Sequence, residues 1–397
     1  MDRVDAQGVI YLDGNSLGVL PAATPARIAA VAEREWGEGL IRSWNDTGLP
    51  RAKSAESRGW ITLSHRIADK VARLIGARPG EVMVGDSTSV NLFKLLNAAI
   101  AISAGPANHE LTNSPRRKVL SERTNFPTDL YIANTMARDR GLELKLVDQP
   151  EIASQLDNRT AILMLTHVNY RTGFMHDMAE LTARAHAAGA LVIWDLAHSA
   201  GAVPVNLYGA TPAAAADFAV GCGYKYLNGG PGAPAFAWAH PRHTAWMDQH
   251  QWRQPLSGWL GHAAPFAFSS EYEPATGISR FVCGTPPVLS LAALECGVDT
   301  VLAAEAVGGL APTVGADEAV DQDERARLGQ HPLDAFFQHR LGQRLGHELG
   351  GARVAGQRHV VDVGMRGDHD HRHEAARVVL VGAQTAHELE PADGPHL

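Results

Sequence analysis

The stretch Leu191-Val192-Ile193-Trp194-Asp195 decides the fold, because four large apolar residues in a row end directly on an acid. A short, continuous apolar run of this kind is typical of a β-strand covered on both faces, as in a parallel sheet. Asp195 would then lie at the carboxyl end of its strand, where open α/β sheets bind their ligands. The run Ala161-Ile162-Leu163-Met164-Leu165 repeats the pattern one strand earlier.

Outward from this stretch, apolar runs alternate with helical patterns along most of the chain. Further strands are predicted at residues 82–84, 118–120, 143–147, 218–220 and 235–238. Helices are predicted at residues 25–36, 60–75, 90–101, 127–138 and 178–188. The alternation predicts an α/β fold with a mainly parallel central sheet and helices on both of its faces.

Composition excludes several classes of protein. The chain has 397 residues, a formal net charge of -8 and a pI near 6.2. An acidic balance disfavours a nucleic-acid partner, which would require a basic face. No apolar run is long enough to span a bilayer, and three cysteines without a CxxC pair indicate reduced thiols. We therefore expect a cytoplasmic protein without a membrane or nucleic-acid partner.

Two segments that follow predicted strands offer polar groups to a ligand. Thr88 and Ser89 begin a helix, where hydroxyl and backbone N–H groups favour an anion, although an ordinary helix cap would look the same. Phe126 and Asp129 follow the strand at 118–120 and offer a flat ring and an acid, although a plain helix start with proline also fits.

The strand-end acid Asp195 and the lysine Lys225 are the more unusual candidates. Asp195 is expected to be poorly hydrated and to need a cationic or hydrogen-bonding partner, which a structural salt bridge would also supply. Lys225 lies between two tyrosines in a glycine-rich loop, where burial disfavours its charged form and favours a nucleophilic amine. The alternative is a turn whose lysine reaches solvent.

Together these residues indicate a site for pyridoxal 5'-phosphate (PLP). PLP chemistry requires a lysine for the covalent link, a carboxylate that keeps the pyridine nitrogen protonated, and an anion site for the phosphate. Lys225, Asp195 and the Thr88-Ser89 pair supply these three parts, and Phe126 supplies an aromatic plate.

The chain also resembles the kynureninase family, which consists of PLP-dependent hydrolases of the aspartate-aminotransferase fold (fold type I). The matching motifs follow the family's order from residue 9 to about residue 310. They are the segments 11–18, 86–92, 126–129, 194–201, 223–228, 255–262 and 283–287. Asp195-Leu196-Ala197-His198 with Tyr224-Lys225-Tyr226-Leu227-Asn228 is specific within the fold.

The resemblance implies a role for each matching position. Lys225 is implied as the cofactor lysine, Asp195 as the partner of the pyridine nitrogen, and Tyr224 as a further acid or base. The implied cofactor-binding set is Thr88, Ser89, Phe126, Asp129, Thr166, Asp195, His198, Tyr224, Lys225, Trp259 and Thr285. In such homodimers Trp259 and Thr285 come from the neighbouring subunit, so the active sites are expected to be shared. No metal is implied.

The implied reaction is hydrolysis of L-kynurenine, or its 3-hydroxy form, to anthranilate and L-alanine in tryptophan catabolism. Trp60 and the Asn15-Ser16 turn are weaker candidates for the pocket that holds the aryl group, and both could equally be packing residues. Two alternatives stay open. One is a related fold type I lyase such as a cysteine-desulfurase-like enzyme, and the other is a catalytically impaired PLP-binding homologue.

The domain organisation is predicted from the same motifs. Residues 1–55 and 286–397 are expected to form the smaller domain, and residues 56–285 the PLP-binding domain. The resemblance weakens after about Leu310, and we find no counterpart of the family's arginine that binds the substrate carboxylate. Nine of the 19 histidines lie between His331 and His396. This abrupt change in composition suggests a shifted reading frame and a tail that is partly disordered; a polar loop, rather than a metal site, is expected at residues 368–374.

Overall fold

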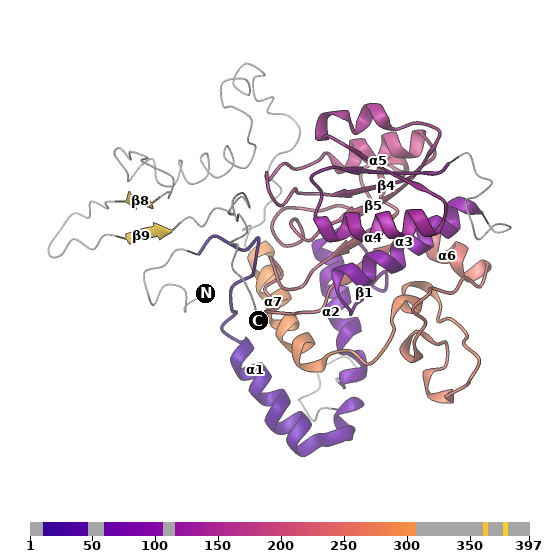
Figure 1. Ribbon diagram of the computed structural model, residues 1–397. Helices are drawn as coiled ribbons and strands as arrows, with labels where there is room; N and C mark the ends of the chain where they lie inside the picture. Colours follow the sequence, from indigo (N-terminus) through magenta and orange to yellow (C-terminus); the bar gives the residue numbers. More distant parts are fainter. Residues whose placement is uncertain (1–10, 47–58, 106–115, 307–359, 364–375, 380–397) are drawn as a thin grey trace, which may run out of the picture.

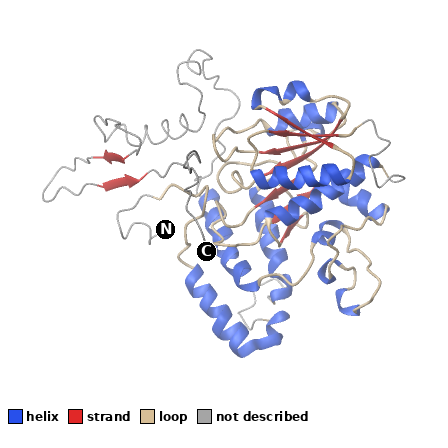
Figure 2. Cartoon of the chain, in the orientation of Figure 1, coloured by secondary structure: helices blue, strands red, loops and turns tan. Residues whose placement is uncertain are grey.

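The computed structural model describes residues 11–46, 59–105, 116–306, 360–363 and 376–379. Its main feature is a seven-stranded sheet with the order β1-β7-β6-β5-β4-β2-β3 (Figures 1 and 2). The strands are β1 (Val82–Val84), β2 (Lys118–Glu122), β3 (Glu143–Val147), β4 (Thr160–Thr166), β5 (Leu191–Asp195), β6 (Phe218–Gly221) and β7 (Phe236–Ala239).

All seven strands in this sheet were predicted, and the mainly parallel arrangement is confirmed. The four pairings from β3 through β2, β4 and β5 to β6 are parallel. The last strand of this sheet differs, because β7 inserts between β1 and β6 and runs antiparallel to both. A loop rather than a crossover helix joins β6 to β7, and an antiparallel pair does not need such a helix.

Helices cover both faces of the sheet. One core joins β5 residues Val192 and Trp194 to α2 (Trp60–Leu74), α5 (Met178–Ala187) and α7 (Val288–Ala306). The other core joins Ile193 to α3 (Thr88–Ala104), α4 (Pro127–Asp139) and α6 (Pro241–Gln249). Successive β5 side chains therefore enter opposite cores, which explains why the strand is apolar throughout. Figure 1 shows α3 and α4 across one face of the sheet.

The first helical segment differs from the single α-helix predicted at residues 25–36. The chain forms α1 (Thr24–Ala30) and then continues as a π-helix over Val31–Gly39 and a 3-10 helix over Leu40–Trp44. Gly37 and Gly39 weaken the α-helical preference of this stretch. In space, α1 packs against α7 (Val288–Ala306), so two segments that are far apart in the sequence lie together.

The described part of the C-terminal tail consists of two strands, β8 (Val360–Val363) and β9 (Ala376–Val379), which pair antiparallel. The run at 368–374, where a polar loop is expected, lies outside the described residues, as does most of the segment that suggested a shifted frame. The domain boundaries stay predictions. Among the described helices, none combines the length and the apolar character that a membrane crossing requires.

A buried carboxylate joins the amino ends of β5 and β6. Asp217 is 1% exposed and accepts hydrogen bonds from the Val192 backbone N–H (2.7 Å), His186 (2.8 Å), His243 (2.6 Å) and Arg242 (2.5 Å). Burial alone would raise the pKa of this carboxyl, but the hydrogen bonds from the two histidines outweigh it and lower the pKa far below the ordinary 3.8.

We predict that Asp217→Asn lowers the free energy of unfolding by about 3 kcal/mol at pH 7, because it leaves buried donors without a charged partner. A lowered folded-state pKa stabilises the fold above the unfolded value of 3.8, and this contribution is lost as the pH falls further. Chemical denaturation from pH 8 to 3 should therefore show a difference that narrows only below about pH 4. An equal difference at every pH would contradict this account.

Candidate active site

The carboxyl ends of three adjacent strands bring the predicted residues together. Thr166 ends β4 and lies in register with Asp195, which ends β5, and Asp195 lies in register with Val220 of β6. Lys225 is in the loop that follows β6. Because parallel strands end at one edge, residues far apart in the sequence become neighbours there.

Lys225 is buried, with 8% of its surface exposed, and its Nζ atom contacts Nε2 of His198. The Nζ atom lies 5.7 Å from the ring centre of Phe126 and 5.8 Å from that of Tyr224. The amine is thus surrounded by one imidazole and two aromatic rings, as a poorly hydrated nucleophile requires. The reading of Lys225 as a lysine that reaches solvent is excluded by this burial.

Close backbone contacts shape the Lys225 loop and attach the N-terminal segment to it. The Gly18 N–H donates to the Tyr224 carbonyl at 2.8 Å, and a Cβ atom on Gly18 would lie only 2.1 Å from the Lys225 carbonyl oxygen. Only glycine permits this approach. The turn that contains Asn15 therefore lies beside the loop that carries the amine.

Asp195 is buried and hydrogen-bonded on both oxygens. Its Oδ1 atom accepts from the Ala197 N–H at 2.8 Å, and its Oδ2 atom accepts from the Thr166 hydroxyl at 3.3 Å. Burial raises the pKa of this carboxyl, while the Ala197 hydrogen bond and the charge of Lys225 act in the opposite direction. Thr166 thus directly contacts Asp195, and both residues belong to the cofactor-binding set that the resemblance implies.

Asp129, in the first turn of α4, is a second buried carboxyl at this edge. It is 3% exposed, and among the described residues no N–H or hydroxyl group donates to its Oδ2 atom; its carboxyl group shares a hydrogen bond with Asp195 instead. Burial raises the pKa of Asp129 well above 3.8, and the negative charge of Asp195 raises it further. Two carboxyl groups that share one dry site favour a state in which one of them holds a proton.

His198 and Tyr224 are both held in their neutral forms. Burial, and then the nearby Lys225 charge, lower the pKa of His198 to about 3, so its Nε2 atom can accept a hydrogen bond from the amine. The Nδ1 atom of His198 is buried without a partner in the described chain. Burial raises the pKa of the Tyr224 phenol to about 12, so the phenol keeps its proton at neutral pH.

A buried lysine stabilises the turn before α3, the helix whose first residues, Thr88 and Ser89, were predicted to bind phosphate. Lys94 is 0% exposed, and its Nζ atom lies 2.6 Å from both the Asp86 carboxylate and the Phe281 carbonyl oxygen. Asp86 has a left-handed backbone (φ 51°) immediately before the helix. Sequence reasoning missed Lys94, because inside an apolar helical run it resembles a solvated residue.

The structure does not bring Trp259 and Thr285 to Lys225. In the described part of the chain, no hydrogen bond or ring contact links either residue to the Lys225 loop; Trp259 instead stacks on Trp44 at 6.2 Å. The segments that carry them adjoin, since the Leu260 N–H donates to the Cys283 carbonyl. Their separation within one chain agrees with the expectation that a neighbouring subunit supplies them, which stays a prediction.

The two weaker candidates for the aryl pocket, Asn15 and Trp60, lie in different surroundings. Asn15 donates to the Tyr170 carbonyl at 3.3 Å, close to the site, whereas Trp60 donates to the buried Glu35 at 2.7 Å and packs as a structural residue. Tyr170 was missed by sequence reasoning. Its ring meets Phe126 edge-on at 5.3 Å and lies 6.2 Å from His198. The available signal was its position just after β4.

The residues at this edge fit PLP. A buried amine, two adjacent buried carboxyls and the His198 Nδ1 atom, which has no partner among the described residues, are costly in a folded chain unless a polar ligand meets them. A flat ring, Phe126, borders the same space and remains 37% exposed. The chemical demands of the pyridine ring, its substituents and the aldehyde correspond to these groups.

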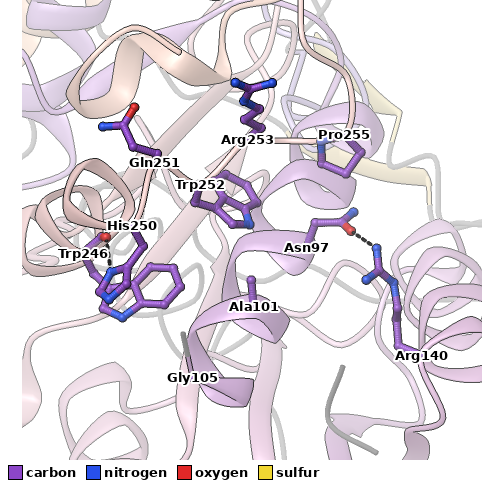
Figure 3. A pocket seen from close by; sticks show the side chains of 10 residues that line it. All are labelled: Asn97, Ala101, Gly105, Arg140, Trp246, His250, Gln251, Trp252, Arg253 and Pro255. Atoms are coloured by element: carbon purple, nitrogen blue, oxygen red, sulfur yellow. Dashed lines mark hydrogen bonds between the residues drawn. The ribbon is translucent and has the colours of Figure 1, made fainter. Parts of the chain in front are cut away.

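A separate cavity of about 450 Å³ lies elsewhere (Figure 3). Asn97, Ala101, Arg140 and Trp252 are among the residues that line it, and Arg140 donates to Asn97 at 3.2 Å. It adjoins the far end of α3, a helix of 17 residues that measures about 25 Å. The cavity is therefore distinct from the predicted site.

We predict that Asp129→Asn stabilises the cofactor-free chain at pH 7.5 by at least about 1 kcal/mol, because it removes a buried acid whose charged form is unfavourable. A raised folded-state pKa costs stability above the unfolded value of 3.8 and nothing below it, so the gain should vanish near pH 3.5. Thermal unfolding at both pH values measures this.

The matched control is Asp139→Asn, at the exposed other end of α4. This variant should leave stability unchanged at both pH values. A gain for Asp129→Asn that is as large at pH 3.5 as at pH 7.5 would show that the buried charge is not its cause.

Curated relatives resemble most of the chain. A kynureninase from Pseudomonas fluorescens is 54% identical over 293 residues, which are 73% of this chain and 64% of that protein. A kynureninase from Burkholderia pseudomallei (strain 1106a) is 53% identical over 292 residues, with 72% and 64% covered. The chain thus spans 64% of the length of these relatives.

Solved structures share the fold at low identity. The apo structure of a cysteine desulfurase from Thermococcus onnurineus NA1 matches with a TM-score of 0.58 at 19% identity, covering 91% of this chain and 80% of that one. The cystine C-S lyase C-DES matches with a TM-score of 0.57 at 17% identity, covering 76% and 73%. These likenesses support the fold type I architecture of the sheet and its helices.

A family model provides the assignment. The model described as aminotransferase class-V matches residues 51–307, which include all seven strands of the main sheet and the loop with Lys225. On this match, together with the strand-edge arrangement of Lys225 and Asp195, the chain belongs to the aminotransferase class-V family.

Proposed function

We propose that the chain is a PLP-dependent hydrolase that cleaves a carbon–carbon bond of L-kynurenine, giving anthranilate and L-alanine. The observation that carries the proposal is the buried amine of Lys225, held against His198 and beside Phe126, with the two buried carboxyls Asp129 and Asp195 at the same strand edge. The similarity to curated kynureninases supports the choice of substrate.

Each residue of the proposed site has a task in this reaction. When bound, PLP withdraws electrons from the α-carbon of an amino acid joined to it. Lys225 holds the cofactor covalently, and its Nζ atom, once free, carries a proton to and from the substrate. Asp195 keeps the pyridine nitrogen protonated, and Asp129 supports it. Phe126 stacks on the ring.

The remaining residues hold the phosphate and move a second proton. Thr88 and Ser89, at the start of α3, bind the phosphate with hydroxyl and backbone N–H groups, and the helix dipole favours its charge. Thr166 orients Asp195 through the hydrogen bond between them. Tyr224 retains its phenolic proton at neutral pH and therefore acts as a donor, first to the phosphate and then in the later proton transfer.

The proposal extends to the range of substrates and to the assembly of subunits and domains. We propose that both L-kynurenine and its 3-hydroxy form are accepted, in tryptophan catabolism. We also propose a homodimer in which Trp259 and Thr285 complete the neighbouring subunit's phosphate site, because no hydrogen bond or ring contact of the described residues joins them to Lys225 and Trp259 stacks on Trp44 instead. The division into a PLP-binding domain at 56–285 and a smaller domain from 1–55 and 286–397 belongs to the same proposal.

A catalytically impaired homologue is the second candidate. The curated relatives extend beyond the matched segment, since only 64% of their length is covered, and the expected carboxylate-binding arginine has no counterpart in the tail. An arginine–carboxylate pair contributes charge-assisted hydrogen bonds, so its loss weakens substrate binding. Resequencing the gene across codons 305 to 397 tests whether the tail results from a shifted frame.

We predict that the purified chain binds PLP with a visible absorbance band, and that adding L-kynurenine releases fluorescent anthranilate. Lys225→Ala should abolish both the band and the release, because no other amine is proposed to form the covalent link. The matched control is Lys70→Ala on α2, since Lys70 forms ion pairs with Glu295 and Asp299 away from the site.

The possible results separate the candidate functions. A band without anthranilate release would identify the impaired homologue, and release of sulfur or alanine from L-cysteine instead would identify a desulfurase-like lyase. Undiminished anthranilate release by Lys225→Ala would exclude the proposed mechanism.

A further inference from the structure

A buried polar cluster lies behind the proposed active site and has no role in the chemistry above. It consists of Glu122 at the end of β2, His176, Asn169 and Thr124. Glu122 and His176 are each 4% exposed and Asn169 is 1% exposed. Charged groups are rarely buried this deeply without a function or a complete set of partners.

The Glu122 carboxylate has hydrogen-bond partners on both oxygens. The Oε2 atom accepts from Nε2 of His176 at 2.8 Å, while the Oε1 atom accepts from Nδ2 of Asn169 at 3.0 Å and from the Thr124 hydroxyl. Burial acts to raise the pKa of Glu122, but the hydrogen bonds from His176 and Thr124 outweigh it and lower the pKa. The group therefore stays ionised and acts as an acceptor for all three donors.

One side of the cluster fixes a hairpin. Asn169 also accepts from the backbone N–H groups of Arg171 (3.0 Å) and Thr172 (3.2 Å), which closes the turn that contains Tyr170. The Asn169 N–H donates to the Phe174 carbonyl, and the His176 N–H donates to the His167 carbonyl, so Glu122 contacts both sides of the hairpin turn. Tyr170, at the hairpin's turn, has its ring against Phe126 and near His198.

The other side of the cluster fixes the segment that presents Phe126. Thr124 is held by both Glu122 and Asn169, which donates to its hydroxyl at 2.9 Å. Asn125 accepts from the Phe126 N–H at 2.6 Å and donates to Ser121 at 3.2 Å. One carboxylate thus joins the two segments whose rings, Phe126 and Tyr170, meet beside Lys225.

We infer that Glu122 is a positioning residue, which through Thr124 and Asn169 holds Phe126 and Tyr170 as one aromatic wall beside Lys225. The inference rests on the proposed function, because the wall is described by its place at the proposed cofactor site. It assigns to Tyr170 a role in ordering the cofactor ring, through its edge-on contact with Phe126.

The test compares Glu122→Gln with Asp217→Asn in the full-length chain. Glutamine has one acceptor oxygen where glutamate has two, so it cannot accept from His176 on one side and from Asn169 and Thr124 on the other. Asp217 is the matched control, because it is also a buried carboxylate that accepts from histidines, but it lies at the opposite ends of the strands. The measurements are melting of the PLP-free protein, the PLP dissociation constant and the visible absorbance maximum.

We expect both variants to lower the melting temperature, because both disturb a buried carboxylate. Only Glu122→Gln should raise the PLP dissociation constant, by about tenfold, and shift the absorbance maximum; tenfold is the scale of one lost hydrogen bond to a charged group. Asp217→Asn should bind PLP within about twofold of the unaltered protein, a difference that corresponds to less than one neutral hydrogen bond.

Other outcomes overturn the inference. It fails if Glu122→Gln melts earlier but binds PLP with unchanged affinity and spectrum, or if both variants lose affinity equally. If Glu122→Gln does not fold, Tyr170→Leu decides, because it leaves the buried charge intact; unchanged affinity and spectrum there refute a role for the wall. If the unaltered chain binds no PLP, the proposed function itself is wrong and this inference falls with it.

Discussion

The rest of this structure depends on the electrostatic interaction among one amine and two carboxyl groups that are buried together at the carboxyl ends of the strands. Lys225, Asp129 and Asp195 are each at least 92% buried by surface area, and each affects the ionisation of its neighbours or is affected by it. In such surroundings a charge without a partner costs several kcal/mol, roughly as much as a small domain can spare. The parallel register of β4, β5 and β6 is what makes this grouping possible.

The site is therefore better suited to holding a polar ligand than to stabilising an empty protein. Among the described residues His198 Nδ1 has no partner and the Asp129 Oδ2 atom has no N–H or hydroxyl donor, whereas both oxygens of the Asp217 carboxylate, at the other end of the strands, accept such hydrogen bonds. The contrast is consistent with a division of labour in which one end of the sheet stabilises the fold and the other leaves groups unsatisfied for binding.

Much of the fold could be predicted because the decisive signals are local. An apolar run that ends on an acid indicates a buried strand and its carboxyl end, and each strand of the main sheet was found within two residues of its position. The direction of β7 could not be predicted from its own residues, because it depends on which strands lie beside it in the sheet. The π-helix at Val31–Gly39 was missed for a related reason, because helical periodicity alone does not separate α from π geometry.

The site could be predicted only as far as its residues follow strands. Asp195 and Lys225 were found by that rule, whereas Thr166 was implied only by the family resemblance. The structure brings Thr166 and Asp195 to one edge. Lys94 and Glu122 were not found, because neither residue directly ends a long apolar run and a charged side chain then looks solvated until its partners are known. Tyr170 was not found either, although it follows β4 closely. Their importance lies in partners that are distant in sequence, such as Phe281 for Lys94 and His176 for Glu122.

The buried Lys94 has a consequence for how two distant segments behave. Its ammonium group is shared between the Asp86 side chain, at the turn before α3, and the main-chain oxygen of Phe281, close to the segment with Cys283 and Thr285. Displacing either partner would leave the buried Lys94 ammonium group with only one acceptor, which costs folding free energy. Any ligand that binds the turn more tightly when the Lys94 contacts are intact must, by thermodynamic reciprocity, also favour those contacts, including the one to the distant segment.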